Sequence, residues 1–189
     1  MAIRTKRWTR LEYERLIDLG IFGPGDRLEL LGGQLVLREP QGRPHATGIR
    51  LVAQALRAAF GPGWSIEAQL PVSLDEESEP EPDVTVVAGG PRDYLAAHPN
   101  RPVLVVEVAL ASLALDRGEK AGLYARAGVA DYWIVNLVDH VLEVHRAPEA
   151  HLDSPYGWHY GSTVTLRPGD RVRPFSAPSA EILVADLLP

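Results

Sequence analysis

The sequence has no cysteine and no long apolar run. The first absence excludes disulfides and thiolate-ligated metal sites, and it is compatible with a reducing compartment. The most apolar strand-like segment, Val103 to Val106, is followed by Glu107 and is far too short to span a bilayer. The N-terminal residues are basic but lack the apolar stretch of a secretory signal. We therefore expect a cytoplasmic protein without a membrane segment.

Lysine is nearly absent, because Lys6 and Lys120 are lysines and all other cationic residues are arginines. Such a bias usually reflects coding preference, so a lysine inside the domain invites a chemical explanation. The formal net charge of −6 argues against a protein that coats nucleic acid, since phosphate binding requires accumulated Lys and Arg. The charge does not exclude a nuclease, because metal ions supply positive charge within a site.

Hydrophobic periodicity predicts three helices. They cover residues 9–20, about 44–60 and 116–127. Asp116 is the expected N-cap of the third helix and Gly128 its stop.

Strand patterns lie between and after these helices. The predicted strands are 28–31, 34–37, 64–74, 83–87, 103–110, 132–137, 141–146 and 163–166, with a short final segment at 181–188. Residues 64–74 alternate in the manner of a half-buried strand, whereas the continuous apolar run 103–110 is typical of a central strand covered on both faces. Gly32-Gly33 predicts a hairpin turn. The order of elements predicts one α/β domain over residues 1–189, with a mixed central sheet flanked by helices.

Glu107 lies inside a run that is otherwise valine, leucine and alanine, so its neighbours predict deep burial. An isolated buried carboxylate is unfavourable, and proteins pair it, protonate it or supply a metal ion. A structural ion pair, or a strand end open to water, is the alternative to a functional role. We favour the functional interpretation because perturbed acids cluster at functional sites.

Asp83 supplies a second carboxylate at the start of its strand. The preceding Pro82 keeps the backbone before it extended. Pro-Asp alone is a common turn pair, but together with Glu107 on a later apolar strand it predicts a two-acid site. Such oxygen ligands suit Mg²⁺ or Mn²⁺ better than zinc.

Lys120 is expected on the helix face that packs against the sheet. Leu123, Tyr124 and Ala127 lie within about 60° of it around the helix axis. The alternative is a lysine whose ammonium reaches water while its stem is covered. Lysine offers a compact charge whose pKa can shift, which arginine does not. With Asp83 and Glu107 in the same domain, a functional lysine is the favoured interpretation.

Several segments resemble the Uma-two family of restriction-endonuclease-like proteins. EPDVTVV, VLVVEVALAS and DRGEKAGLYARAGVADYWIV resemble the core of that family, and LELLGGQLV and PHATGIRLVAQAL are similar to its upstream elements. The resemblance covers about Arg27 to Arg146. It implies the fold of the PD-(D/E)XK nuclease superfamily, a mixed sheet flanked by helices.

The superfamily pattern places an acid at the end of one strand and, on the next, a second acid two residues before a lysine. Asp83 matches the first acid and Glu107 the second, but the position two beyond Glu107 is Ala109. The resemblance implies that the lysine role has moved to Lys120, in the DxxxK stretch of the following helix.

The activity implied by the resemblance is metal-dependent hydrolysis of DNA phosphodiester bonds. Asp83, Glu107 and the backbone carbonyl of Val108 would hold Mg²⁺ or Mn²⁺, which would activate a water and stabilise charge on the phosphate. Lys120 would orient or help to activate that water, or would neutralise developing charge. The residues expected to support these groups are Glu29, His45, Gln69 and Tyr124. For His45, a purely structural histidine is the competing interpretation.

Two other functions remain open. A catalytically inactive module that binds nucleic acid or a protein partner is favoured by the acidic net charge and by Ala109 at the usual lysine position. Hydrolysis of another phosphate ester would use the same metal chemistry. A homodimer is expected if both strands of a duplex are cut, because two sites related by a two-fold axis suit that task.

The sequence gives no support to several other enzyme classes. Its six histidines form no HExxH pattern, GGPRD and GPGDR lack the lysine and spacing of a phosphate-binding loop, and no GxSxG is present. The basic N-terminal residues are typical of a solvated arm, with contact to a DNA backbone as the alternative; they are Arg4, Lys6, Arg7 and Arg10.

Overall fold

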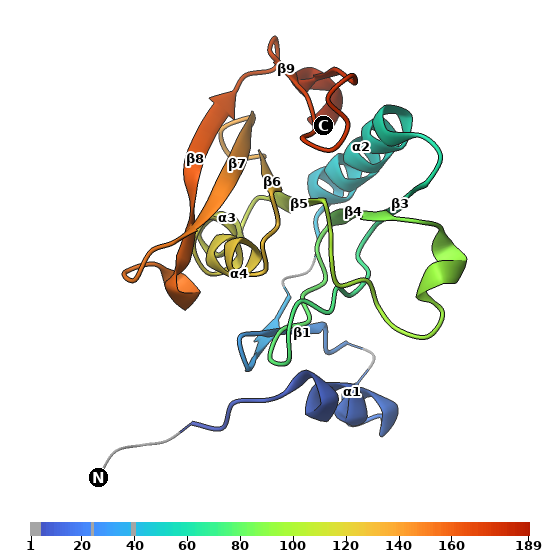
Figure 1. Cartoon of the computed structure of the whole chain (residues 1–189), viewed down its shortest axis with the longest axis vertical. Helices are drawn as coiled ribbons and strands as arrows, with labels where there is room; N and C mark the ends of the chain where they lie inside the picture. Colours follow the sequence, from blue (N-terminus) through green and yellow to red (C-terminus); the bar gives the residue numbers. More distant parts are fainter. Residues whose placement is uncertain (1–4, 24, 39–40) are drawn as a thin grey trace.

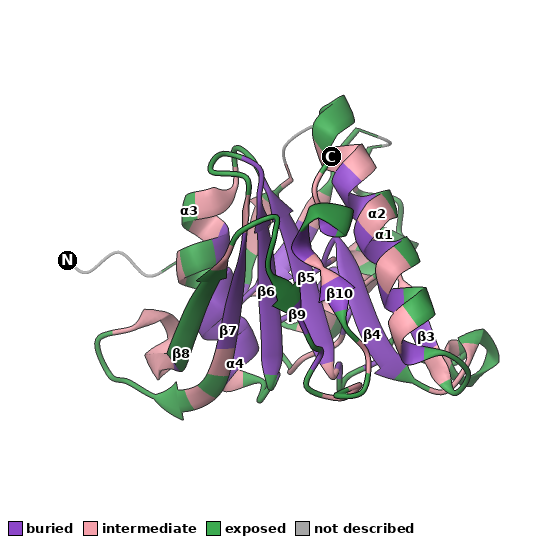
Figure 2. Cartoon of the chain, turned by 90° about the horizontal axis from the view of Figure 1, so that it is seen from above, coloured by how far each residue is buried: buried purple, intermediate pink, exposed green. Residues whose placement is uncertain are grey.

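The central feature of the fold is a sheet of six strands. The computed structural model describes residues 5–23, 25–38 and 41–189, so Arg4 lies outside the described residues. In order across the sheet, the strands are β3 (Trp64–Glu67), β4 (Val84–Ala88), β5 (Leu104–Ala109), β6 (Asp131–Asn136), β7 (Val141–Ala150) and β8 (Trp158–Leu166). Neighbours are antiparallel except β5 and β6, which run parallel. Figure 2 shows the buried strands in the middle of the sheet and the exposed β8 at one edge.

The remaining elements are helices and two small antiparallel strand pairs. The pairs are β1 (Leu28–Leu31) with β2 (Gln34–Leu37), and β9 (Arg171–Val172) with β10 (Ile182–Leu183). The helices are α1 (Arg10–Asp18), α2 (Arg43–Phe60), α3 (Leu113–Leu115), the π-helical turn η2 (Asp116–Lys120) and α4 (Ala121–Arg126), with single 3₁₀ turns η1 (Pro91–Tyr94), η3 (Pro155–Gly157) and η4 (Val184–Leu187). Figure 1 shows α1 and β1 at one end of the molecule and the C-terminal segment at the other.

Helices cover both faces of the sheet, which confirms the predicted α/β class. On one face, α2 and the C-terminal segment pack against Val106 and Val108. On the other, α4 packs against Val105 and Tyr132. Because side chains alternate along a strand, Glu107 shares its face with Val105 and lies under the helical segment that contains α4.

The connection from β5 to β6 is what brings a helix over Glu107. Parallel neighbours require a crossover connection, and here it consists of α3, η2 and α4. Within it the Ala121 N–H donates to the carbonyl of Asp116, five residues back, which widens the helix locally. Asp116 and Lys120, at the two ends of this turn, are both buried.

The prediction that Asp116 caps this helix is wrong. The helical segment begins earlier, at Leu113, and the Asp116 side chain is almost fully buried at 1 % exposure. The end of the segment agrees with the prediction, since Gly128 adopts a φ of 75°, in the left-handed region that glycine favours. The prediction failed because the residues around a buried acid inside a helix can match the sequence pattern of an N-cap.

The prediction of a single strand over 64–74 is wrong beyond Glu67. Gln69 adopts a φ of 56°, which breaks the extended conformation, and its N–H donates to the carbonyl of Asp83 at 3.2 Å. Pro71 has no N–H to continue a ladder. Leu70, expected on the apolar face, is half exposed. At the other edge of the sheet, β8 begins at Trp158, earlier than predicted.

The predicted hairpin is confirmed, and its contacts explain the acidic connection 75–82. Gly32 and Gly33 have φ values of 53° and 79°, so both occupy the left-handed region that a tight hairpin turn requires. Leu30 exchanges two backbone hydrogen bonds with Glu79, at 2.8 and 3.3 Å. The connection therefore runs along β1 and delivers the chain to Asp83 with Glu29 nearby.

Across 5–23, 25–38 and 41–189, no helix has the length and apolar character needed to cross a membrane.

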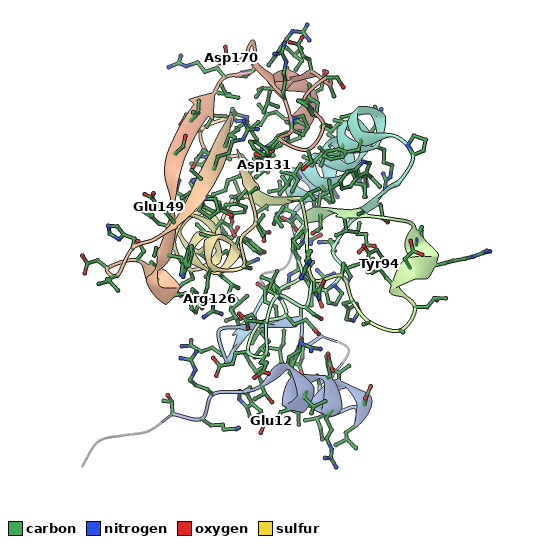
Figure 3. The ribbon with its side chains drawn as sticks, viewed as in Figure 1. Glu12, Tyr94, Arg126, Asp131, Glu149 and Asp170 are labelled. Carbon is green, nitrogen blue, oxygen red and sulfur yellow. The ribbon has the colours of Figure 1, made fainter. Side chains whose placement is uncertain are left out.

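Asp131 fastens the C-terminal segment to the sheet (labelled in Figure 3). This fully buried carboxylate accepts hydrogen bonds from Trp133 Nε1 at 2.8 Å, Arg146 Nε at 2.8 Å and the Phe175 N–H at 2.7 Å.

Asp131→Ala should lower the free energy of unfolding by about 3–5 kcal/mol, because it leaves a buried donor and a cation unpaired. Urea denaturation would measure the change, with the exposed Asp18→Asn as control. Equal midpoints for the two variants would contradict the prediction.

Candidate active site

Two buried carboxylates face each other where β4 begins. The β4–β5 register pairs Val84 with Val106, so Asp83, one residue before, lies opposite Glu107. Each acid is only 3 % exposed. The Val108 N–H donates to Asp83 Oδ2 at 2.8 Å, which fixes that carboxylate against β5. Since the N–H and C=O of a strand residue point to the same edge, the Val108 carbonyl also faces the β4 side.

Lys120 reaches the same point from the crossover. Its Nζ lies 3.0 Å from Glu107 Oε1 and 3.1 Å from Glu29 Oε1. The Tyr124 hydroxyl donates to the same Glu107 oxygen at 2.7 Å. Glu29 Oε2 accepts the N–H of Glu81 at 3.1 Å. The hairpin, the central strand and the crossover are thus joined through one buried ammonium group.

The second oxygen of Asp83 contacts two further groups. His45 Nε2, near the N-terminus of α2, lies 3.1 Å from Asp83 Oδ1. Arg38 Nη2, just after β2, lies 3.6 Å from the same oxygen. His45 therefore meets the candidate acid directly.

These side chains line one cavity of about 300 Å³. The acidic and basic side chains around it are Glu29, Arg38, His45, Asp83, Glu107, Asp116 and Lys120. Nothing in the sequence marks Arg38, and Asp116 was predicted to cap the helix. The DxxxK spacing was the available signal for Asp116, because residues four apart on a helix project to one side.

Gln69 does not line this cavity. Its side-chain Nε2 is buried without a hydrogen-bond partner among the described residues. Its backbone contacts the carbonyl that precedes β4, so its connection to Asp83 runs through the main chain.

Comparison with known proteins places the chain in a family. A family model named Uma2, with the description "Putative restriction endonuclease", matches residues 11–178. The chain belongs to the Uma2 family. A solved structure described as "a putative nuclease belonging to DUF820 from Anabaena variabilis ATCC 29413" has the same fold, with a TM-score of 0.66 and 16% identity over 91% of this chain and 96% of that one. No curated protein matches the sequence.

The electrostatics of this Uma2 site are dominated by an excess of carboxylates. Burial raises the pKa of Glu107 to about 8; Lys120 opposes the rise, and Asp116 and Asp83 add to it. Burial likewise raises the pKa of Asp116 to about 6, against the effect of Lys120. For Lys120, burial favours the neutral form, but the surrounding carboxylates outweigh it and raise its pKa above the ordinary value.

Asp83 behaves in the opposite way. Burial alone would raise its pKa, but the hydrogen bond and charge of His45, together with the Val108 N–H, hold that pKa below the ordinary value. The lowered pKa favours the ionised form of Asp83, whereas a pKa of about 8 favours the protonated form of Glu107 at neutral pH.

The donor set suits a hard divalent cation. Four carboxylates line the cavity against the charges of Lys120 and Arg38, and one oxygen of Glu107 has no hydrogen-bond partner among the described residues. Carboxylate oxygens with a backbone carbonyl are ligands that Mg²⁺ accepts, with water completing its coordination. No three Asp, Glu or His side chains in the described ranges are grouped closely enough to enclose an ion. Asp83 and Glu107 are the residues that would hold such an ion.

The raised pKa of Glu107 predicts a pH-dependent stability in the presence of a chelator. Between its ordinary pKa of 4.5 and about 8, the folded state binds more protons than the unfolded state. The free energy of unfolding of the wild type should therefore fall as pH rises through this window. Glu107→Gln removes that titration and keeps an oxygen that can accept from Lys120 and Tyr124.

The measurement is urea denaturation of both proteins in chelator, from about pH 5 to about pH 9. The stability of Glu107→Gln relative to wild type should increase by a few kcal/mol, in order of magnitude, toward high pH. Parallel pH profiles of the two proteins would show that Glu107 titrates in its ordinary range.

Proposed function

We propose that this Uma2 chain is a metal-dependent endonuclease that hydrolyses DNA phosphodiester bonds. The observation that carries the proposal is the Lys120 ammonium held 3.0 Å from Glu107, opposite Asp83, although the expected lysine position is Ala109. A cation, two acids and a cavity of about 300 Å³ then occur together, as phosphoryl-group chemistry requires.

In this proposal, Asp83, Glu107 and the Val108 carbonyl hold Mg²⁺ or Mn²⁺. The bound ion would supply a lowered water pKa and positive charge against the phosphate. Lys120 orients the attacking water by hydrogen bonding and offsets charge that develops on the phosphate. Tyr124 and Glu29 hold Glu107 and Lys120 in position, and His45 keeps Asp83 ionised.

Plasmid nicking tests this function. Wild type should nick supercoiled DNA with Mg²⁺ or Mn²⁺ and not in chelator, and Asp83→Asn and Glu107→Gln should each lower the rate by about 100-fold or more, because each removes charge from the ion site. Glu79→Gln is the matched control, since Glu79 is a buried carboxylate that does not line the cavity. Equal nicking by wild type and both site variants would assign the activity to a contaminant.

A non-catalytic module is the second candidate. It is favoured by the lack of a three-ligand group in the described part of the chain and by the existing contacts of both Asp83 oxygens.

Calorimetric titration with Mn²⁺ separates the two candidates. For a nuclease, wild type and Glu79→Gln should bind Mn²⁺ with similar affinity, whereas Asp83→Asn should bind at least about tenfold more weakly, because it removes a charged ligand. The same weak heat from all three proteins would favour the non-catalytic module.

A further inference from the structure

Arg38 is a second cation at the candidate active site, and neither the superfamily pattern nor the proposed ligand set uses it. It follows β2 and lines the cavity together with Asp83 and Lys120. Its side chain is only 12 % exposed. Placing a guanidinium group in such a position requires compensation for lost hydration, so its surroundings should reveal its role.

The two ends of the guanidinium group are used differently. Nη1 donates to Glu81 Oε2 at 2.6 Å, a normal charge-assisted hydrogen bond. Nη2 lies 3.6 Å from Asp83 Oδ1, beyond hydrogen-bonding distance. Among the described residues, Nη2 has no hydrogen-bond acceptor, so one end of the group is anchored while the other retains donors next to the candidate acid.

Lys120 cannot easily perform the task that these donors suit. Its ammonium lies between Glu29 and Glu107, and its side chain is 6 % exposed. An incoming phosphate is larger than a water molecule and carries its charge on outward oxygens. Arginine remains charged among carboxylates, and Nη2 of Arg38 can donate to one such oxygen while Nη1 stays bonded to Glu81.

We propose that Arg38 is a phosphate-binding residue, whose Nη2 donates to a non-bridging oxygen of the DNA phosphate that occupies the cavity. This inference rests on the proposed nuclease function. In this arrangement the substrate phosphate binds on the hairpin side of the cavity, and Lys120 contacts Glu107 and the attacking water. Arg38 would bind the phosphate in the ground state as well as during hydrolysis, so its loss should be visible in DNA binding without any metal.

The competing explanation is a purely structural role, in which the ion pair of Arg38 with Glu81 only holds the end of β2 against the segment before β4. Glu81→Gln separates the two, because it weakens the anchor at Nη1 and leaves the guanidinium group in place. If the role of Arg38 is only structural, Glu81→Gln and Arg38→Gln should lower DNA affinity and nicking equally. If Arg38 binds phosphate, Arg38→Gln should lower both far more than Glu81→Gln does.

The experiment compares wild type, Arg38→Gln, Arg38→Lys, Glu81→Gln and the exposed control Arg167→Ala. Thermal melts establish that each is folded. Fluorescence anisotropy with labelled DNA in chelator, over a salt series, gives the affinity and its salt dependence. Nicking rates with Mn²⁺ give kcat and KM.

Arg38→Gln should lower kcat/KM by about 10- to 100-fold and reduce the slope of log K against log salt by about 1. Arg38→Lys should restore the salt slope, because it restores the charge, but not the full kcat/KM, because an ammonium group cannot reproduce the planar arrangement in which one end bonds Glu81 and the other donates to phosphate. Glu81→Gln and Arg167→Ala should remain within about threefold of wild type.

Equal losses in Arg38→Gln and Glu81→Gln with an unchanged salt slope would overturn the inference and leave the nuclease function standing. Absence of metal-dependent nicking by the wild type would instead refute the proposed function. The DNA-binding measurements would then test whether Arg38 binds phosphate. In that case, a reduced salt slope in Arg38→Gln supports phosphate binding, and an unchanged slope or no DNA binding by wild type overturns it.

Discussion

The buried ammonium of Lys120 is the interaction on which the organisation of this molecule depends. It contacts Glu107 on the central strand and Glu29 in the hairpin, and it comes from the crossover helix. Three parts of the chain that are distant in sequence therefore meet at one charge. Replacing such a group by apolar side chains is often neutral or stabilising in other proteins, so stability alone does not explain its presence. The four carboxylates that line the cavity outnumber the charges of Lys120 and Arg38, and this excess is what motivates the metal ion in the proposed function.

The topology of the sheet explains why the carboxylates meet where they do. β4 and β5 are antiparallel, so the residue that enters β4 lies opposite a residue near the end of β5. β5 and β6 are parallel, so a helical crossover must pass over the same end of β5. The two acids and the lysine thus converge because β4 and β5 are antiparallel whereas β5 and β6 are parallel. The acidic connection 75–82 contributes by pairing with β1, which places Glu29 under the ammonium.

Local patterns predicted much of this arrangement from sequence. The hairpin, α2, β4 and β5 have strong periodicity or turn signals, and the structure confirms them. Glu107 was recognisable because a carboxylate in an apolar run must be compensated. The end of β3 was predicted too late, because the apolar alternation continues past Gln69 while the backbone changes direction to contact the carbonyl before β4. The sequence signal against a longer strand was Pro71.

Arg38 and Asp116 were also missed. In an arginine-rich chain nothing marks Arg38 in the sequence, and its importance arises from the contact with Asp83 and the cavity. Asp116 has the local pattern of a helix cap, and only the earlier start of the helix turns its side chain inward. The contact of Arg38 with Asp83 is tertiary and leaves no mark in the sequence, whereas the spacing of Asp116 and Lys120 was a signal that the capping pattern hid.

Ala109 allows the crossover helix to pack closely against β5. It is fully buried on the same face of β5 as Glu107, and it packs in the cluster that contains Ala121 and Tyr124. A lysine at 109 would occupy the space in which the crossover helix meets the strand. With a small residue there, the helix approaches closely enough for Lys120 to reach Glu107 and for Tyr124 to share the same oxygen. Ala109 is therefore the packing condition under which the helix brings the ammonium group of Lys120 to Glu107.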